Sequence, residues 1–277
     1  MNSARESKMM KKFLILSAFI LVFFYGCSEE NNPVEVVETP PASSVWYDGN
    51  TYAPDSLLSW GMGKSQTDYI HNDKEYDWYI DQANTGSAAV SNCGPSCVTM
   101  AIKWYDKNFS KTAADARTMF PLNGGWWYTN NIIDYLNYYT IKNSIIGFSD
   151  PAQLETVLKD GNIAILCIST EFLRYNSVQT QRVDRFYSYA SGHFIVIKGI
   201  RKVDNVTYFE AYDSNTWNAK YTDGSLKGKN RHYRSDDISN AIKKWWNYII
   251  VVSKNDVSKN LNDRLEKSSA INHMWGK

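Results

Sequence analysis

The apolar pattern of this chain changes its period partway along the sequence, and that change restricts the fold more than any other feature. Residues 93–105 carry apolar side chains three or four positions apart, the spacing of a helix with one buried face. Two further helices are predicted, one capped by Thr129 and one running from Asp150 to about Lys159. Beyond them, short uninterrupted runs of β-branched and aromatic residues indicate strands buried on both faces. The predicted strands are 163–168, 193–200, 206–212 and 248–253.

Helices grouped before a set of strands predict an α+β domain with a mostly antiparallel sheet. One more helix, capped by Ser235, is expected between the last two strands. From Trp46 to Ser253 the sequence has no linker rich in Pro, Gly or Ser and no internal repeat, so we expect a single domain over 46–253. Residues 254–277 are polar and are expected to form a tail or a fraying helix.

The first 26 residues have the pattern of an export signal. Lys11 and Lys12 precede an apolar run from Phe13 to Tyr25. As a helix, that run would be about 20 Å long, which is too short for the ~30 Å hydrocarbon core of a membrane. Because Cys27 follows a small residue, the segment resembles a bacterial lipoprotein signal, which implies that Cys27 becomes a lipidated N-terminus. A plain signal peptide or a short anchor is the alternative.

Residues 27–45 lack apolar periodicity and are expected to tether the domain to its lipid. Glu29 and Glu30, directly after the lipid cysteine, resemble surface-export signals of some Gram-negative lipoproteins. We therefore expect an exported protein that is anchored to a bacterial membrane, the outer membrane in particular, and faces the periplasm or the surface.

Composition excludes several classes of function. The chain has 30 Lys and Arg against 29 Asp and Glu without charge blocks, so no nucleic-acid partner is expected. Four cysteines are too few for a disulfide-stapled scaffold. No metal or other cofactor is expected, because the four histidines show no spacing typical of a metal site. These are His71, His193, His232 and His273.

The most informative motif is Asn92-Cys93-Gly94-Pro95-Ser96, at the start of the first predicted helix. Backbone N–H groups are unpaired there and the helix dipole is positive, so a cysteine at this point has a lowered pKa. Glycine permits close approach of the backbone to a substrate, and proline is tolerated in a first turn. The motif predicts that Cys93 is a nucleophile; the alternative is a structural cysteine that fills a helix start.

A cysteine nucleophile needs a base, and His193 opens a predicted strand. The next strand ends at Asp213. If the hairpin is centred on residue 203, these two residues face each other, and the carboxylate can orient the imidazole. Asn215 is an alternative orienting residue, and a core histidine satisfied by a carboxylate is the alternative role for His193.

An acyl-transfer reaction also needs donors for its oxyanion. The backbone N–H of Cys93 is one candidate. The Gln82 side chain, eleven residues upstream, is a second, and Asn84 and Asn92 compete with it.

This order of Gln82, Cys93, His193 and Asp213 resembles the papain-like cysteine peptidases, and most closely the bacterial branch whose members cleave double-glycine leaders from bacteriocin precursors. The resemblance covers about residues 77–253. It implies that Cys93 attacks a peptide carbonyl, His193 shuttles the proton, Asp213 orients His193 and Gln82 helps hold the oxyanion. The spacing from Gln82 to Cys93 is longer than usual, Ser214 replaces a common proline, and no Walker-type loop accompanies the domain, so a different substrate is expected.

Two further cysteines, an aromatic segment and a basic stretch could each serve either structure or function. Cys97 and Cys167 are expected in the core. The sequence Trp126-Trp127-Tyr128 either floors a substrate cleft or packs in the core or a loop. A basic stretch is expected on the solvated surface or against an acidic substrate; it contains Lys227, Lys229, Arg231 and Arg234.

The leading hypothesis is an exported, lipid-anchored, papain-like cysteine peptidase that hydrolyses peptide or protein substrates through a Cys93 thioester without a cofactor. One alternative is a cell-wall peptide amidase or acyl transferase with the same residues. The other is a surface lipoprotein that keeps the fold as a binding module without catalysis.

Overall fold

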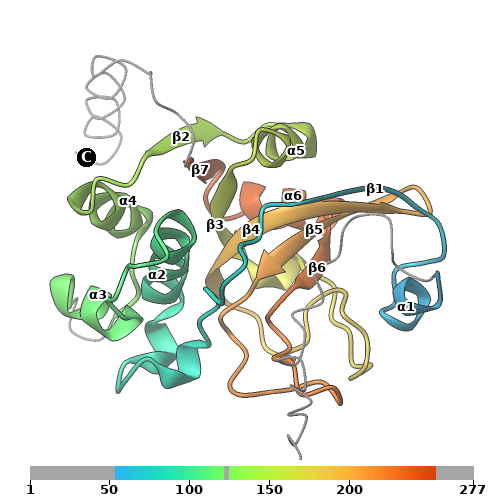
Figure 1. Cartoon of the computed structure of the whole chain (residues 1–277), viewed down its shortest axis with the longest axis horizontal. Helices are drawn as coiled ribbons and strands as arrows, with labels where there is room; N and C mark the ends of the chain where they lie inside the picture. The colour runs from blue at the N-terminus through green and yellow to red at the C-terminus, as the bar shows by residue number, and fades with distance from the viewer. Residues whose placement is uncertain (1–53, 122–124, 254–277) are drawn as a thin grey trace, which may run out of the picture. The chain divides into compact units, whose positions relative to one another are not determined.

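Seven strands form one sheet in the computed structural model, which describes residues 54–121 and 125–253 (Figure 1). The strand order is β2-β7-β3-β4-β5-β6, β1 pairs with β4, and all the strand pairs are antiparallel. The strands are β1 (Gln66–His71), β2 (Asn143–Gly147), β3 (Ile163–Ser169), β4 (Gly192–Val203), β5 (Val206–Tyr212), β6 (Arg231–Arg234) and β7 (Tyr248–Val252). The predicted signal peptide with Cys27, the tether 27–45 and the tail 254–277 lie outside the described residues.

The four predicted helices are present, two of them starting one residue earlier than expected. Asp150 is the N-cap of its helix as predicted, and its carboxylate accepts the N–H of Ala152 at 2.7 Å. Thr129 and Ser235 are first helical residues rather than caps. The helices are α1 (Pro54–Ser59), α2 (Cys93–Tyr105), α3 (Ala113–Met119), α4 (Thr129–Tyr138), α5 (Pro151–Lys159) and α6 (Ser235–Lys243). None of the helices in the described ranges is long and apolar enough to cross a membrane.

Helices cover both faces of the sheet, which explains the uninterrupted apolar runs. Along β3, Ile163, Ile165 and Cys167 pack in one core cluster with α2 and α4. The alternate residues of β3 pack in a second cluster with α5 and α6. Because both faces of a central strand are buried, every residue of β3 is buried. The α+β fold class predicted from the sequence is confirmed, with the helix that begins at Cys93 packed on an antiparallel sheet (Figure 1).

The hairpin of β4 and β5 has a different register from the predicted one. Its turn is Asp204-Asn205, both at positive φ, so the strands pair from Val203 and Val206 onward. A bulge between Ile197 and Gly199 shifts the register once more. The predicted centre at residue 203 is therefore wrong, and His193 does not oppose Asp213 in the ladder.

Candidate active site

Cys93 is the first residue of α2, and the residue before it does not cap the helix. The side chain of Asn92 makes no capping hydrogen bond. Its amide donates to the carbonyl and hydroxyl of Thr85 at 3.1 and 3.0 Å, and its oxygen accepts from Arg117 Nε at 2.6 Å. Because the Asn92 side chain does not cap the helix, it leaves the first backbone N–H groups of α2 without that acceptor, and the N–H of Gly94 interacts with the Cys93 thiol.

Gly94 allows a close approach to the chain itself rather than to a substrate. A Cβ at this position would lie 2.9 Å from the Cβ of Trp127, so any larger residue would push the helix away from the Trp126-Trp127 segment. The glycine of the Cys-Gly-Pro motif thus fixes how near that segment comes to Cys93.

The thiol of Cys93 is buried and has partners that favour its charged form. Burial alone would raise its pKa, but the hydrogen bond and charge of His193 lower it, as do the backbone N–H groups of Phe194 and Gly94. The net effect holds the pKa of Cys93 below its ordinary value. A thiolate paired with an imidazolium is the state that these contacts stabilise.

His193 is buried at the start of β4 and contacts Asp213 directly. Its Nε2 lies 2.8 Å from Asp213 Oδ1, which leaves Nδ1 for the thiol of Cys93. Burial alone would lower the pKa of His193, but the Asp213 carboxylate and Cys93 raise it to about 10. The predicted contact between His193 and Asp213 is present, although the register from which it was deduced is wrong. Asp213 lies just beyond the end of β5, where the chain has left the ladder.

Asp213 is completely buried and accepts four hydrogen bonds. Its Oδ1 accepts hydrogen bonds from the His193 imidazole and from the N–H of Asn215, the latter at 2.9 Å. Its Oδ2 accepts hydrogen bonds from the hydroxyls of Tyr233 at 2.5 Å and Tyr187 at 3.2 Å. Burial alone would raise its pKa, but the charge and hydrogen bond of His193 and the Tyr233 hydroxyl lower it. The two tyrosines were missed by the sequence analysis, since neither belongs to a recognisable motif.

The side chain of Asn215, the alternative orienting residue, is engaged elsewhere. Its oxygen accepts from the Tyr189 hydroxyl and from Trp217 Nε1, both at 2.6 Å. Only its backbone N–H reaches the Asp213 carboxylate. The geometry therefore favours Asp213 over Asn215 as the group that orients His193.

Gln82 joins the segment before Cys93 to the segment after Asp213. Its backbone N–H donates to the Ser214 carbonyl at 2.9 Å, and its side-chain oxygen accepts from the Ser214 hydroxyl at 3.0 Å. Its amide nitrogen donates to the carbonyl of Ala89 at 3.3 Å, which uses one of its two N–H bonds. Asn92 uses both of its amide N–H bonds on Thr85, so Gln82 has a free donor that Asn92 lacks.

Asn84, the other competing donor, lies in the short 3-10 turn η1 (Gln82–Asn84). Its amide donates to the side-chain oxygen of Asn218 at 3.2 Å, in an exposed contact. The structure thus directs Asn84 toward a surface loop, whereas Gln82 is buried.

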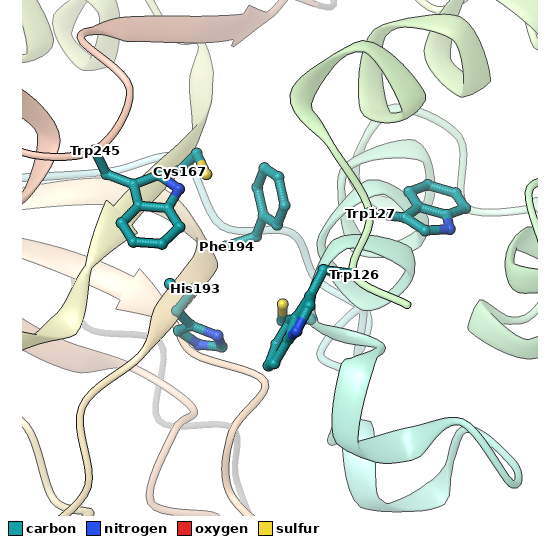
Figure 2. A pocket seen from close by; sticks show the side chains of 8 residues that line it. Trp126, Trp127, Cys167, His193, Phe194 and Trp245 are labelled. Atoms are coloured by element: carbon teal, nitrogen blue, oxygen red, sulfur yellow. The ribbon is translucent and has the colours of Figure 1, made fainter. Parts of the chain in front are cut away.

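A pocket of about 230 Å³ opens beside Cys93 and His193. Figure 2 shows Trp245 and Trp126 on opposite sides of it, with Phe194 between them, and Trp127 pointing away toward the helices. We call it the aromatic pocket; its lining residues are Cys93, Trp126, Trp127, Cys167, Gly192, His193, Phe194 and Trp245. Trp126 is 54% exposed, whereas Trp127 is buried, so the predicted aromatic segment serves both as a cleft wall and as core packing.

The other two cysteines of the described residues, Cys97 and Cys167, are free and buried. Cys97 is in the core as predicted, and burial raises its pKa well above the ordinary value. Cys167 is also buried as predicted, and in addition its thiol lines the aromatic pocket. Within 54–121 and 125–253, no group of three or more His, Cys, Asp or Glu side chains is arranged to hold a metal ion.

Two residues of the basic stretch, Lys227 and Arg231, are buried, so the prediction that this stretch lies on the solvated surface is wrong for them. Arg231 belongs to β6, is completely buried, and donates to the backbone carbonyls of Gln181 and Asp184 at 2.6 Å. Lys227 is buried as well. Arg231 fastens neighbouring segments of the chain, because a guanidinium can donate to several carbonyls at once, and Lys227 donates to the side-chain oxygen of Gln179.

The chain is similar to known proteins in sequence and in fold. The sequence matches the model of the Peptidase_C39 like family over residues 75–249, a range that includes Gln82, Cys93, His193 and Asp213. Among solved structures, a crystal structure described as that of a C39-like peptidase from Bacillus anthracis is similar, with a TM-score of 0.44 and 12% identity. That match covers 69% of this chain and 100% of the other. No curated protein matches the sequence significantly.

Proposed function

Because the chain belongs to the peptidase C39-like family, we propose that it is a cysteine peptidase with Cys93 as nucleophile, His193 as general acid and base and Asp213 as orienting residue. The observation that carries the proposal is the buried chain of contacts from Cys93 through His193 to Asp213, with a lowered thiol pKa and a raised imidazole pKa. The Cys93 thiolate is then a nucleophile and the His193 imidazolium a proton donor, and both are present at neutral pH.

In the proposed reaction the Cys93 thiolate attacks the carbonyl carbon of a peptide bond, and the carbonyl oxygen becomes an oxyanion. The backbone N–H of Cys93 and the free amide N–H of Gln82 stabilise this oxygen. His193 then gives its proton to the departing nitrogen as the C–N bond breaks, which leaves a thioester on Cys93. Water next loses a proton to His193 and attacks the thioester; the C–S bond breaks, and the thiolate and a carboxylic acid product are released.

The test is the pH dependence of iodoacetamide alkylation at each cysteine, followed by peptide mass spectrometry. We expect Cys93 to react rapidly at neutral pH, since its thiolate is stabilised. Cys97 and Cys167 serve as internal references, because burial raises the pKa of both thiols. In His193→Ala the reaction of Cys93 should require a more alkaline pH. Equal labelling of the three cysteines, unaffected by His193→Ala, would contradict the proposal.

Activity provides the second arm of the test. Cys93→Ala should abolish cleavage of a casein or peptide substrate. Cys97→Ala is the matched control, because it removes a buried thiol one turn further along the same helix and should retain cleavage. A binding module without catalysis would show no cleavage by the wild type and ligand binding that Cys93→Ala does not alter. Cleavage of purified peptidoglycan but not of casein would indicate the amidase instead.

A further inference from the structure

The aromatic pocket combines the candidate reacting groups with an apolar lining. Apart from the Cys93 thiol and the His193 imidazole, its walls in the described part of the chain are aromatic rings, the Cys167 thiol and the backbone of Gly192. No Lys, Arg, Asp or Glu side chain is among these lining residues. The pocket is therefore matched to an occupant without charge.

Trp245 is held over the edge of this pocket instead of being folded into the core. A Cβ on Gly192 would come within 2.5 Å of the Trp245 ring, so the indole lies directly on the glycine backbone. The indole also makes a hydrogen bond with the Cys167 thiol. The ring nevertheless remains 57% exposed, and it faces Trp126 across the pocket (Figure 2). An exposed ring fixed in this way is available for contact with a ligand.

The size and polarity of the pocket limit its occupant. Its volume of about 230 Å³ is below the lower end of pockets that hold a complete small-molecule ligand, so it suits one side chain. A sugar or a charged side chain would lose water here without gaining enough hydrogen bonds. Two of the three indole N–H groups are already engaged, that of Trp127 with the Phe120 carbonyl at 3.2 Å and that of Trp245 with Cys167.

We propose that the aromatic pocket is a specificity subsite that takes one large apolar side chain, Phe, Tyr or Leu, of the peptide cleaved at Cys93. This inference rests on the proposed function. It distinguishes the chain from peptidases that cleave double-glycine leaders, because a glycine has no side chain to bury between Trp126 and Trp245. The preference arises from apolar area removed from water at the moment the substrate occupies the site.

The experiment maps the cleavage sites in an unbiased peptide library by mass spectrometry. We expect Phe, Tyr or Leu at one fixed position relative to the cleaved bond, with Gly and Asp disfavoured there. Two peptides that differ only in Phe or Gly at that position are then compared. Their kcat/KM values should differ by about 10- to 200-fold, the range of discrimination by an apolar pocket.

Trp126→Ala and Trp245→Ala should each reduce the Phe-to-Gly ratio of kcat/KM by about tenfold, because each removes apolar contact with the Phe side chain alone. Both side chains are more than half exposed, so their removal should leave the fold intact. Tyr138→Ala is the matched control: it removes an aromatic ring that is 64% exposed on α4, outside the pocket lining, and should leave the ratio unchanged.

Three results would distinguish a wrong subsite proposal from a wrong peptidase proposal. Cleavage that depends on Cys93 but prefers glycine or a charged residue would overturn the subsite alone. Preference for purified peptidoglycan over the Phe peptide, again dependent on Cys93, would also overturn it. Absence of any cleavage that depends on Cys93 would overturn the proposed peptidase and the subsite together.

Discussion

The Asp213 carboxylate decides how firmly His193 holds its proton. It is completely buried, and its four hydrogen-bond donors fix it beside the imidazole. The lowered pKa of Cys93 and the raised pKa of His193 define the pH range in which the thiolate and the imidazolium coexist. Activity should therefore rise through the pKa of Cys93, which lies below its ordinary value, and fall as the pH approaches about 10.

Asp213→Asn removes the charge that raises the pKa of His193. The folded-state pKa of His193 should then fall, so the alkaline limb of the pH profile should move down by about one to three pH units. The value of kcat should fall by about a hundredfold or more, since the proton donor is less often charged and less well oriented. The measurement is the pH profile of kcat with a peptide substrate.

Asn215→Ala is the control for this variant, since it keeps the backbone N–H that reaches Asp213. We expect its alkaline limb to coincide with that of the wild type. A downward shift in Asn215→Ala, with Asp213→Asn unshifted, would assign the orienting role to Asn215 instead.

At the scale of elements, a buried cluster of charges occupies the bulge of β4. Lys198 is completely buried, and its Nζ lies 2.9 Å from Asp73 Oδ2 and 2.5 Å from Glu210 Oε1. These contacts tie the segment after β1 to both strands of the central hairpin. Because these charged groups are buried, removing one of them leaves the others without compensation and lowers the free energy of unfolding.

Lys198→Met would leave two carboxylates without their shared cation. We expect the free energy of unfolding to fall by about 3–5 kcal/mol, measured by urea denaturation. Lys202→Met is the matched control on the same strand: Lys202 is 32% exposed, pairs with Glu155 at 3.0 Å, and its loss should cost under about 1 kcal/mol. Similar losses in the two variants would show that burial adds nothing to the energy of the Lys198 cluster.

Helices and strands with strong apolar periodicity could be predicted from the sequence. The pairing register of β4 with β5 could not. The run 206–212 reappears unchanged as β5, and the helix predicted over 93–105 is α2. Strand β1 was missed because its sequence, Gln-Thr-Asp-Tyr-Ile-His, lacks a buried apolar run. The predicted register was wrong because the hairpin turn is Asp204-Asn205, two residue types that tolerate positive φ, and was not recognised. The bulge between Ile197 and Gly199 shifts the register further, and no local sequence preference signals it.

At the scale of the whole domain, the candidate site gathers residues from segments far apart in the chain. Cys93 and His193 were predictable because each lies at the start of an element, and Asp213 because it directly follows the end of one. Tyr187 was not, since it lies in the long segment 173–191 before β4, which shows no periodicity. Arg231 positions that segment through its backbone carbonyls, which is a tertiary contact that no sequence pattern signals.

The predicted lipid anchor at Cys27 would determine where the proposed peptidase acts. If Cys27 is the lipidated N-terminus, the full chain expressed in a Gram-negative bacterium should be found in the membrane fraction. Its N-terminal peptide should carry the mass of the acyl chains, because more than one chain is needed for stable anchoring. Cys27→Ser should release the domain from the membrane, and Cys97→Ala, which removes a buried thiol, should not. A membrane-bound Cys27→Ser protein would indicate the short anchor, and an unlipidated, released wild type would indicate a plain signal peptide.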